Sequence, residues 1–194
     1  MWPTIVQDFL ASGEAPNFHT ALIVWPVNLI SEQTEEVSYW SGWEPVDLNL
    51  GGVRSLIPTS GALGVGPPTY SEGTDIRNQD CRMFGRSVQA ASILKSYNVR
   101  FKPAETWQLC FTQGAAFVGA RRLFKGFVDG TPQRIGVKGQ GATLSIKLAS
   151  AMRTGTRTVV AKKSHASYQL RGGDTAMEYA SLTSVDSDWW GARG

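Results

Sequence analysis

The stretch ATLSIKLAS, residues 142–150, decides the fold class. Its apolar and polar side chains alternate: Leu144, Ile146 and Leu148 against Thr143, Ser145 and Lys147. A period of two places the apolar side chains on one face of an extended chain and the polar ones on the other. The stretch therefore predicts a strand with one buried face.

Further extended segments lie on both sides of this strand. They are expected within residues 20–29, 35–48, 74–85, 99–111 and 117–130, with turns at Ser41-Gly42, in residues 113–116 and at Asp129-Gly130. The chain of 194 residues is 42% hydrophobic and contains 21 glycines, so it has enough apolar residues for a core and many turns. Strands at short, regular spacing predict a mainly β domain, a barrel or a sandwich.

One helix is predicted over residues 86–97. Ala90, Ile93, Leu94 and Tyr97 fall at i, i+3, i+4 and i+7, which forms one apolar stripe. Such a helix should lie on a sheet or close a barrel end. Asn98 is expected to end the helix in a left-handed conformation.

Two segments lack a clear strand or helix pattern. Residues 1–18 are expected to form an N-terminal arm, with a short apolar segment from Ile5 to Leu10. Residues 51–73 hold six glycines and three prolines, which predicts a long loop with short extended pieces. No phosphate-binding glycine motif occurs there, so a nucleotide cradle is not expected. Residues 19–151 are then the β domain.

Charge is divided unevenly along the chain. Residues 1–97 carry 10 acidic and 5 basic residues, and residues 98–194 carry 6 acidic and 14 basic residues. Eight bases and no acid lie between residues 130 and 173: Arg134, Lys138, Lys147, Arg153, Arg157, Lys162, Lys163 and Arg171. This basic block is a solvated face, a nucleic-acid contact, or a match for an acidic neighbouring subunit.

Enzyme and metal signatures are weak. The histidines, His19 and His165, are far apart, and no nucleophile motif frames Ser164 or Ser167. Cys81 and Cys110 lack metal-ligand spacing and are expected as buried thiols in a reducing compartment. The carboxylates suited by composition alone to glycoside hydrolysis are Glu35, Glu36, Glu44 and Asp47. No catalytic residue, metal or cofactor is predicted.

Seven tryptophans indicate an interface protein, since aromatic side chains anchor interfaces. Trp189 and Trp190 lie close to the end of the sequence, where a chain is usually poorly ordered unless it docks in a pocket. Trp25, Trp40 and Trp43 suit either base or sugar stacking, or a core or an interface.

The order of these parts resembles the tail-tip proteins, hub or distal tail, of long-tailed non-contractile bacteriophages and gene transfer agents. The resemblance rests on GTDIRNQDCRMFG followed by the helix, on VRFKPAETWQLCF, on RRLFKGFVDGTPQRIG and GATLSIKLASAM, and on the ending KKSHASYQLRGGDTAMEYASLTSVDSDWWG. It covers roughly residues 20–191. No cysteine lies near the end of this sequence, so an iron–sulfur cluster of larger hub proteins is not carried over.

The resemblance implies a tail-tube-like β-barrel or sandwich whose residues 152–194 form an extended C-terminal assembly arm. The residues expected at subunit interfaces are Arg153, Arg157, Lys162, Lys163, Gln169, Arg171, Gly173, Asp174, Tyr179, Trp189 and Trp190. Gly172-Gly173 allows a sharp turn, and Thr175 with Glu178 has capping-box spacing for a short helix. The alternative is a segment that folds back on its own domain.

The expected function is therefore structural. The chain would form a trimeric or hexameric ring that joins the tail tube to the tape measure, hub, fibres or receptor-binding parts and leaves a path for DNA. It would be made in the host bacterial cytoplasm and reside at the virion tail tip, without a membrane anchor. Two alternatives are a nucleic-acid-binding β-barrel and a carbohydrate-binding or wall-degrading tail module that uses Trp40 or Trp43.

Overall fold

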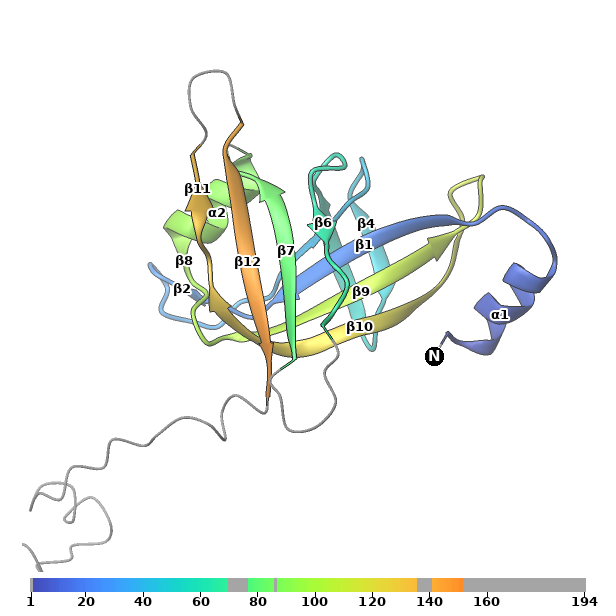
Figure 1. Cartoon of the computed structure of the whole chain (residues 1–194), viewed down its shortest axis with the longest axis horizontal. Coiled ribbons are helices and arrows are strands. Elements are labelled where there is room, and N and C mark those ends of the chain that lie inside the picture. The colour runs from blue at the N-terminus through green and yellow to red at the C-terminus, as the bar shows by residue number, and fades with distance from the viewer. Residues whose placement is uncertain (1, 70–76, 86, 136–140, 152–194) are drawn as a thin grey trace, which may run out of the picture. The chain divides into compact units, whose positions relative to one another are not determined.

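The fold is mainly β, as the sequence predicts, and most strands belong to one sheet (Figure 1). The computed structural model describes residues 2–69, 77–85, 87–135 and 141–151. The strands of this sheet are β1 (Asn17–Val24), β3 (Val37–Trp40), β4 (Val46–Asn49), β5 (Val53–Pro58), β6 (Gly64–Val65), β7 (Asn78–Phe84), β9 (Pro103–Phe111), β10 (Phe117–Gly130), β11 (Gln133–Arg134) and β12 (Thr143–Ser150). Their order is β4-β5-β3-β1-β9-β10-β12-β7-β6, with β11 paired to β12. All neighbours are antiparallel except β3 and β5.

The sheet curls until β6 lies beside β1, which gives a barrel-like arrangement. Its interior is filled from one face of each strand, and β12 shows the rule most clearly. Leu144, Ile146 and Leu148 are at most 1% exposed, whereas Lys147 is exposed. The strand predicted from this alternation is therefore confirmed, and we call the cluster that it joins the barrel interior.

A second apolar cluster covers the opposite face of β1 and β9. Ala21 and Ile23 of β1 pack there with Leu48 of β4 and Leu56 of β5, because the β4–β5 hairpin folds over that face. Strand β1 is consequently buried on both faces from Ala21 to Val24. We call this cluster the outer cluster.

The predicted helix is α2 (Val88–Ser96). The Ser87 side chain caps it by accepting the Ala90 N–H at 3.1 Å. Ala90 and Ile93 are buried in the barrel interior, and Leu94 and Tyr97 pack against it, so the apolar stripe is confirmed.

The predicted end of this helix is wrong. The chain leaves α2 at Ser96 and enters strand β8 (Tyr97–Asn98), which pairs with β2 (Val27–Asn28). Pairing with Val27 holds Asn98 in a strand rather than in a left-handed cap.

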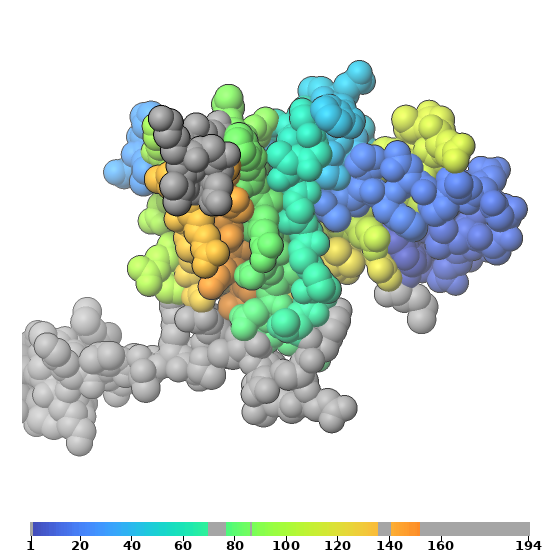
Figure 2. All heavy atoms as spheres, turned by 45° about the horizontal axis from the view of Figure 1, so that its top comes forward, coloured from blue at the N-terminus to red at the C-terminus, as the bar shows by residue number. Residues whose placement is uncertain are grey.

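A second helix, α1 (Thr4–Ala11), was not predicted. It lies within the segment expected as an N-terminal arm and packs on β10. Figure 2 shows the N-terminal residues in blue against the tip of β9 and β10. The boundary expected at residue 18 falls inside β1, since that strand begins at Asn17.

The segment expected as a long loop contains regular structure. Strand β5 lies within residues 51–73 and pairs with β4 on one edge and with β3 on the other. Strand β6 pairs with β7. The glycine content led to a prediction with too little strand. Two of these glycines, Gly51 and Gly52, form the turn between β4 and β5 at positive φ, so they join two strands rather than interrupt one.

Candidate interaction surfaces on the β1–β9–β10 ribbon

Strands β1, β9 and β10 form a ribbon that runs beyond the barrel (Figure 1). On the face continuous with the barrel interior, α1 covers the end of this ribbon. Val6, which is fully buried, sits over Gly119, where an added Cβ would lie 2.6 Å from its Cγ2. The Trp2 ring stacks on Phe18 at 5.7 Å, and the Arg121 guanidinium lies over Trp2 at 4.7 Å.

Helix α1 also exposes apolar side chains. Ile5 is 63% exposed and Leu10 is 37% exposed, and Phe18 beside the helix is 44% exposed. Val6 is the buried residue of the helix, so its own docking hides little of its apolar surface. This end of the ribbon therefore leaves three large apolar side chains exposed.

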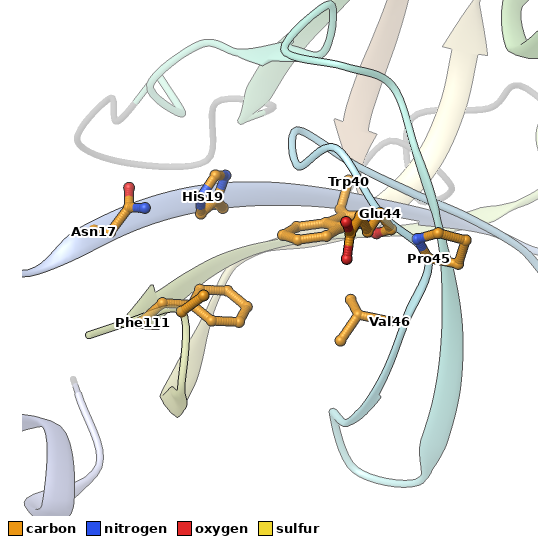
Figure 3. Close-up of a pocket in the computed structure, with 8 residues that line it drawn as sticks. Asn17, His19, Trp40, Glu44, Pro45, Val46 and Phe111 are labelled. Atoms are coloured by element: carbon orange, nitrogen blue, oxygen red, sulfur yellow. The ribbon is translucent and has the colours of Figure 1, made fainter. Parts of the chain in front are cut away.

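The other face of the ribbon carries a hollow of about 170 Å³ (Figure 3). Its lining comes from the start of β1, the end of β9 and the β3–β4 turn: Asn17, His19, Trp40, Glu44, Pro45, Val46, Phe111 and Ala115. The Trp40 and Phe111 rings stack at 5.7 Å, and the His19 ring meets both edge-on at 5.2 and 5.5 Å. The hollow therefore combines two stacked aromatic rings with the polar side chains of Asn17, His19 and Glu44.

His19 forms a serine–histidine pair in this hollow. Its Nδ1 lies 3.1 Å from the Ser41 Oγ, which also accepts the Thr20 N–H at 3.1 Å. Since Ser41 accepts from the backbone, its own hydroxyl is free to donate to the imidazole. Burial lowers the pKa of His19, which favours the neutral ring that accepts this bond.

A neutral histidine beside a serine is the first part of a catalytic pair, but an orienting acid is needed as well. Among the residues that the structure describes, no carboxylate is hydrogen-bonded to His19.

A polar cluster lies further along the same face. Glu105 on β9 is 9% exposed and is paired with Arg122 at 3.3 Å and with Lys125 at 3.6 Å, both on β10. The Trp107 Nε1–H donates to Glu105 at 3.1 Å, and Arg122 lies over the Trp107 ring at 5.8 Å.

A second stacked pair lies nearby. Arg54 lies 5.0 Å above the Trp25 ring, and both residues line a second hollow of about 330 Å³ that also includes Glu105 and Lys125. The ribbon thus presents two arginine–tryptophan pairs on its outer side.

Three of the four carboxylates considered for glycoside hydrolysis are hydrogen-bonded or paired, and the third of these, Asp47, accepts from Ser55. Glu35 accepts hydrogen bonds from Asn28, Ser31 and Tyr97, and the Asn28 bond is the largest cause of its lowered pKa. Glu36 is paired with Arg54. A carboxyl with a lowered pKa stays ionised near neutral pH, which is unsuitable for a general acid.

The tryptophans and cysteines divide by burial. Trp40 is 7% exposed and donates its indole N–H to the Glu44 carbonyl, whereas Trp43 is 73% exposed. Of these two, Trp43 is the one placed to stack on a ligand. Cys81 and Cys110 are buried thiols, as predicted, and burial raises the pKa of Cys81 to about 12.

The eleven residues expected at subunit interfaces all lie within residues 152–194, outside the described residues. Of the basic block, Arg134 on β11 and Lys147 on β12 are described, and both are exposed. The pairs His19–Ser41, Arg54–Trp25 and Arg122–Trp107 were not anticipated. The sequence predicted only an extended segment over residues 99–111, and Arg122 as the partner of Trp107 follows from the register of β9 and β10.

No protein-family model matches the chain, and no curated protein matches its sequence. Across the described ranges, no helix is both long and apolar enough to cross a membrane. Within the same part of the chain, no three His, Cys, Asp or Glu side chains converge as a metal site would require.

Proposed function

We propose that this protein is a structural component of a bacteriophage tail tip. It forms an oligomeric ring that joins the tail tube to hub, fibre or receptor-binding parts and leaves a path for DNA. Its role is mechanical rather than catalytic, and residues 152–194 act as the arm that joins subunits. The tail-tip identity is supported by the resemblance in the order of its sequence segments.

The observation that carries the ring proposal is the separation of charge along the sheet. Acidic side chains on and around β3 and β4 are Glu36, Glu44 and Asp47, of which Glu36 is paired with Arg54 of β5. Described basic side chains gather on β10, β11 and β12: Arg121, Arg122, Lys125, Arg134 and Lys147. A subunit with acidic and basic strands on different parts of its sheet fits a head-to-tail neighbour, and repeated head-to-tail contacts form a ring where the rotation between neighbours closes.

Light scattering of the purified full-length protein at low and high salt tests the proposal. We expect a discrete trimer or hexamer, which Lys162→Glu/Lys163→Glu converts to a folded monomer. Lys95→Glu/Arg100→Glu, which changes two exposed bases outside the arm, is the matched control and should still assemble. A wild-type protein that stays monomeric at both salt concentrations contradicts the ring proposal.

The stacked pairs Arg54–Trp25 and Arg122–Trp107 favour one second candidate, a nucleic-acid-binding β-barrel. Arginine and aromatic side chains together form platforms for unpaired bases. This candidate predicts binding to single-stranded DNA that weakens steeply with salt. Absent or salt-insensitive binding removes it.

A further inference from the structure

Strand β10 has an open edge. Its partner β12 pairs with it from Gly126 to Gly130, and the chain leaves β12 at Ser150, opposite Gly126. Residues 117–125 of β10 therefore pair with β9 alone within the described part of the chain. An unpaired row of backbone N–H and C=O groups is a template for another strand.

The direction of each backbone group on this edge follows from two hydrogen bonds. The Ser150 N–H donates to the Arg77 carbonyl at 2.8 Å, so the backbone N–H and C=O groups of Ser150 face away from β10. Its register partner on β10, Gly126, therefore directs its own backbone groups toward β9. The Trp25 N–H donates to the Pro103 carbonyl at 3.1 Å, so the backbone groups of the next residue, Ala104, face β10 and its partner Gly126. This second hydrogen bond also places the Gly126 backbone groups toward β9.

The register with β9 shows which residues of β10 have backbone groups on the open edge. On β9, residues whose backbone groups face β10 alternate with residues whose groups face β1. The residues of the second kind, Glu105, Trp107 and Leu109, pair with Lys125, Arg122 and Ala120 of β10. The N–H and C=O groups of these β10 residues therefore face the open edge.

The edge is basic. Lys125 is 67% exposed and Arg122 is 46% exposed, and the single carboxylate Glu105 faces both. Two such edges brought together would oppose like charges, which is destabilising. A partner strand with acidic side chains is favoured instead.

This chain supplies such a strand at the far end of its sheet. Strand β4 ends the strand order and pairs with β5 alone among the described residues. It carries Asp47 and follows Glu44, both exposed. Residues 1–53 contain seven acidic residues and no lysine or arginine, and Glu36 among them is paired with Arg54.

We propose that the open edge of β10 pairs with β4 of a second copy of this chain, with Lys125 and Arg122 against Glu44 and Asp47. This contact deepens the proposed function and rests on it, since it supplies the head-to-tail interface of the ring. Because the two edges differ, each subunit offers one edge to each neighbour, and the contact is heterologous.

A charge swap in the full-length protein tests the contact. Lys125→Glu and Glu44→Lys should each weaken self-association about tenfold or more, because each sets like charges across the interface. The double variant Lys125→Glu/Glu44→Lys should restore association, since the two edges are again opposite in charge. Lys95→Glu, an exposed base on α2 outside the proposed contact, is the matched control and should assemble normally.

A second pair of variants tests the backbone. Ala120→Pro removes one outward N–H, which an edge strand tolerates in the monomer, and should reduce association; Ala120→Gly should not. Circular dichroism checks that every variant is folded, and sedimentation measures its mass.

The outcomes separate this contact from the ring proposal. Normal assembly of both single charge variants, or a double variant that stays dissociated, overturns the β10–β4 contact and leaves the ring in place. A wild type that never associates overturns both.

Discussion

Strand β10 passes through two environments, and the contrast separates folding from assembly. From Gly126 to Gly130 it lies in the barrel wall, paired with β12 on one edge. On the other edge Gly126 and Phe127 pair with β9, and Val128 is hydrogen-bonded to Phe101 and Lys102. From Phe117 to Lys125 it pairs with β9 and carries α1. Residues 126–130 are held between two partner segments, whereas residues 117–125 carry three bases and leave one backbone edge unpaired within the described part of the chain.

The largest expected effect lies in the barrel. Ile146→Ala removes a 1% exposed side chain from the barrel interior and should lower the free energy of unfolding by about 2–5 kcal/mol. Lys147→Ala, on the exposed face of the same strand, should change it by less than about 0.5 kcal/mol. Urea denaturation measures both, and equal losses would show that this face of β12 is not the core side.

A glycine pair compares the two halves of β10 directly. An added Cβ at Gly126 would overlap the Ala149 carbonyl oxygen and lie 2.8 Å from the Phe124 ring, so Gly126→Ala should cost about 1–3 kcal/mol. At Gly119 the added Cβ meets only side chains of α1, Val6 and Ile5, which can move away with the helix.

Gly119→Ala should therefore release α1 with little loss of global stability. Hydrogen exchange should show reduced amide protection confined to residues 4–12, whereas Gly126→Ala should lower protection across β10 and β12. A Gly119→Ala protein destabilised as much as Gly126→Ala would mean that α1 belongs to the cooperative core.

Local sequence patterns predicted the elements that can be recognised without knowing which other elements they pack against. The alternation in residues 142–150 gives β12, and the stripe from Ala90 to Tyr97 gives α2, because one face of each must be buried whatever covers it. Helix α1 was not predicted because it has only eight residues and its N-cap residue, Pro3, makes no side-chain hydrogen bond. Its position also depends on contact with Gly119, which is far along the chain. The parallel pairing of β5 with β3 is long-range in the same way.

The candidate site was less predictable than the fold. Sequence reasoning placed the interface in residues 152–194, and that assignment stays a prediction. The described surfaces arise from register: His19 meets Ser41 across 22 residues, and Arg122 meets Trp107 because β10 bulges between Arg122 and Phe124. Neither register nor bulge position can be read from residue types alone.

The smallest expected effect concerns His19 on the ribbon. Burial lowers the pKa of His19 below its usual value of 6.5, so the unfolded chain binds a proton more readily than the folded one. Stability therefore rises with pH: the His19 contribution is fully present above about pH 6.5 and is lost as the pH falls through the folded pKa. His19→Asn removes the titration and keeps a polar side chain beside Ser41.

Urea denaturation of the wild type and of His19→Asn between pH 5 and pH 8 measures this effect. The difference in unfolding free energy should be constant above pH 7 and should shift against the wild type as the pH falls, because only the wild type contains the His19 imidazole. A difference that does not change with pH would show that His19 is as hydrated in the folded chain as in the unfolded one. The aromatic hollow would then be an open part of the ribbon surface. The ribbon would in that case be more accessible than the barrel on its outer face as well as along the edge of β10.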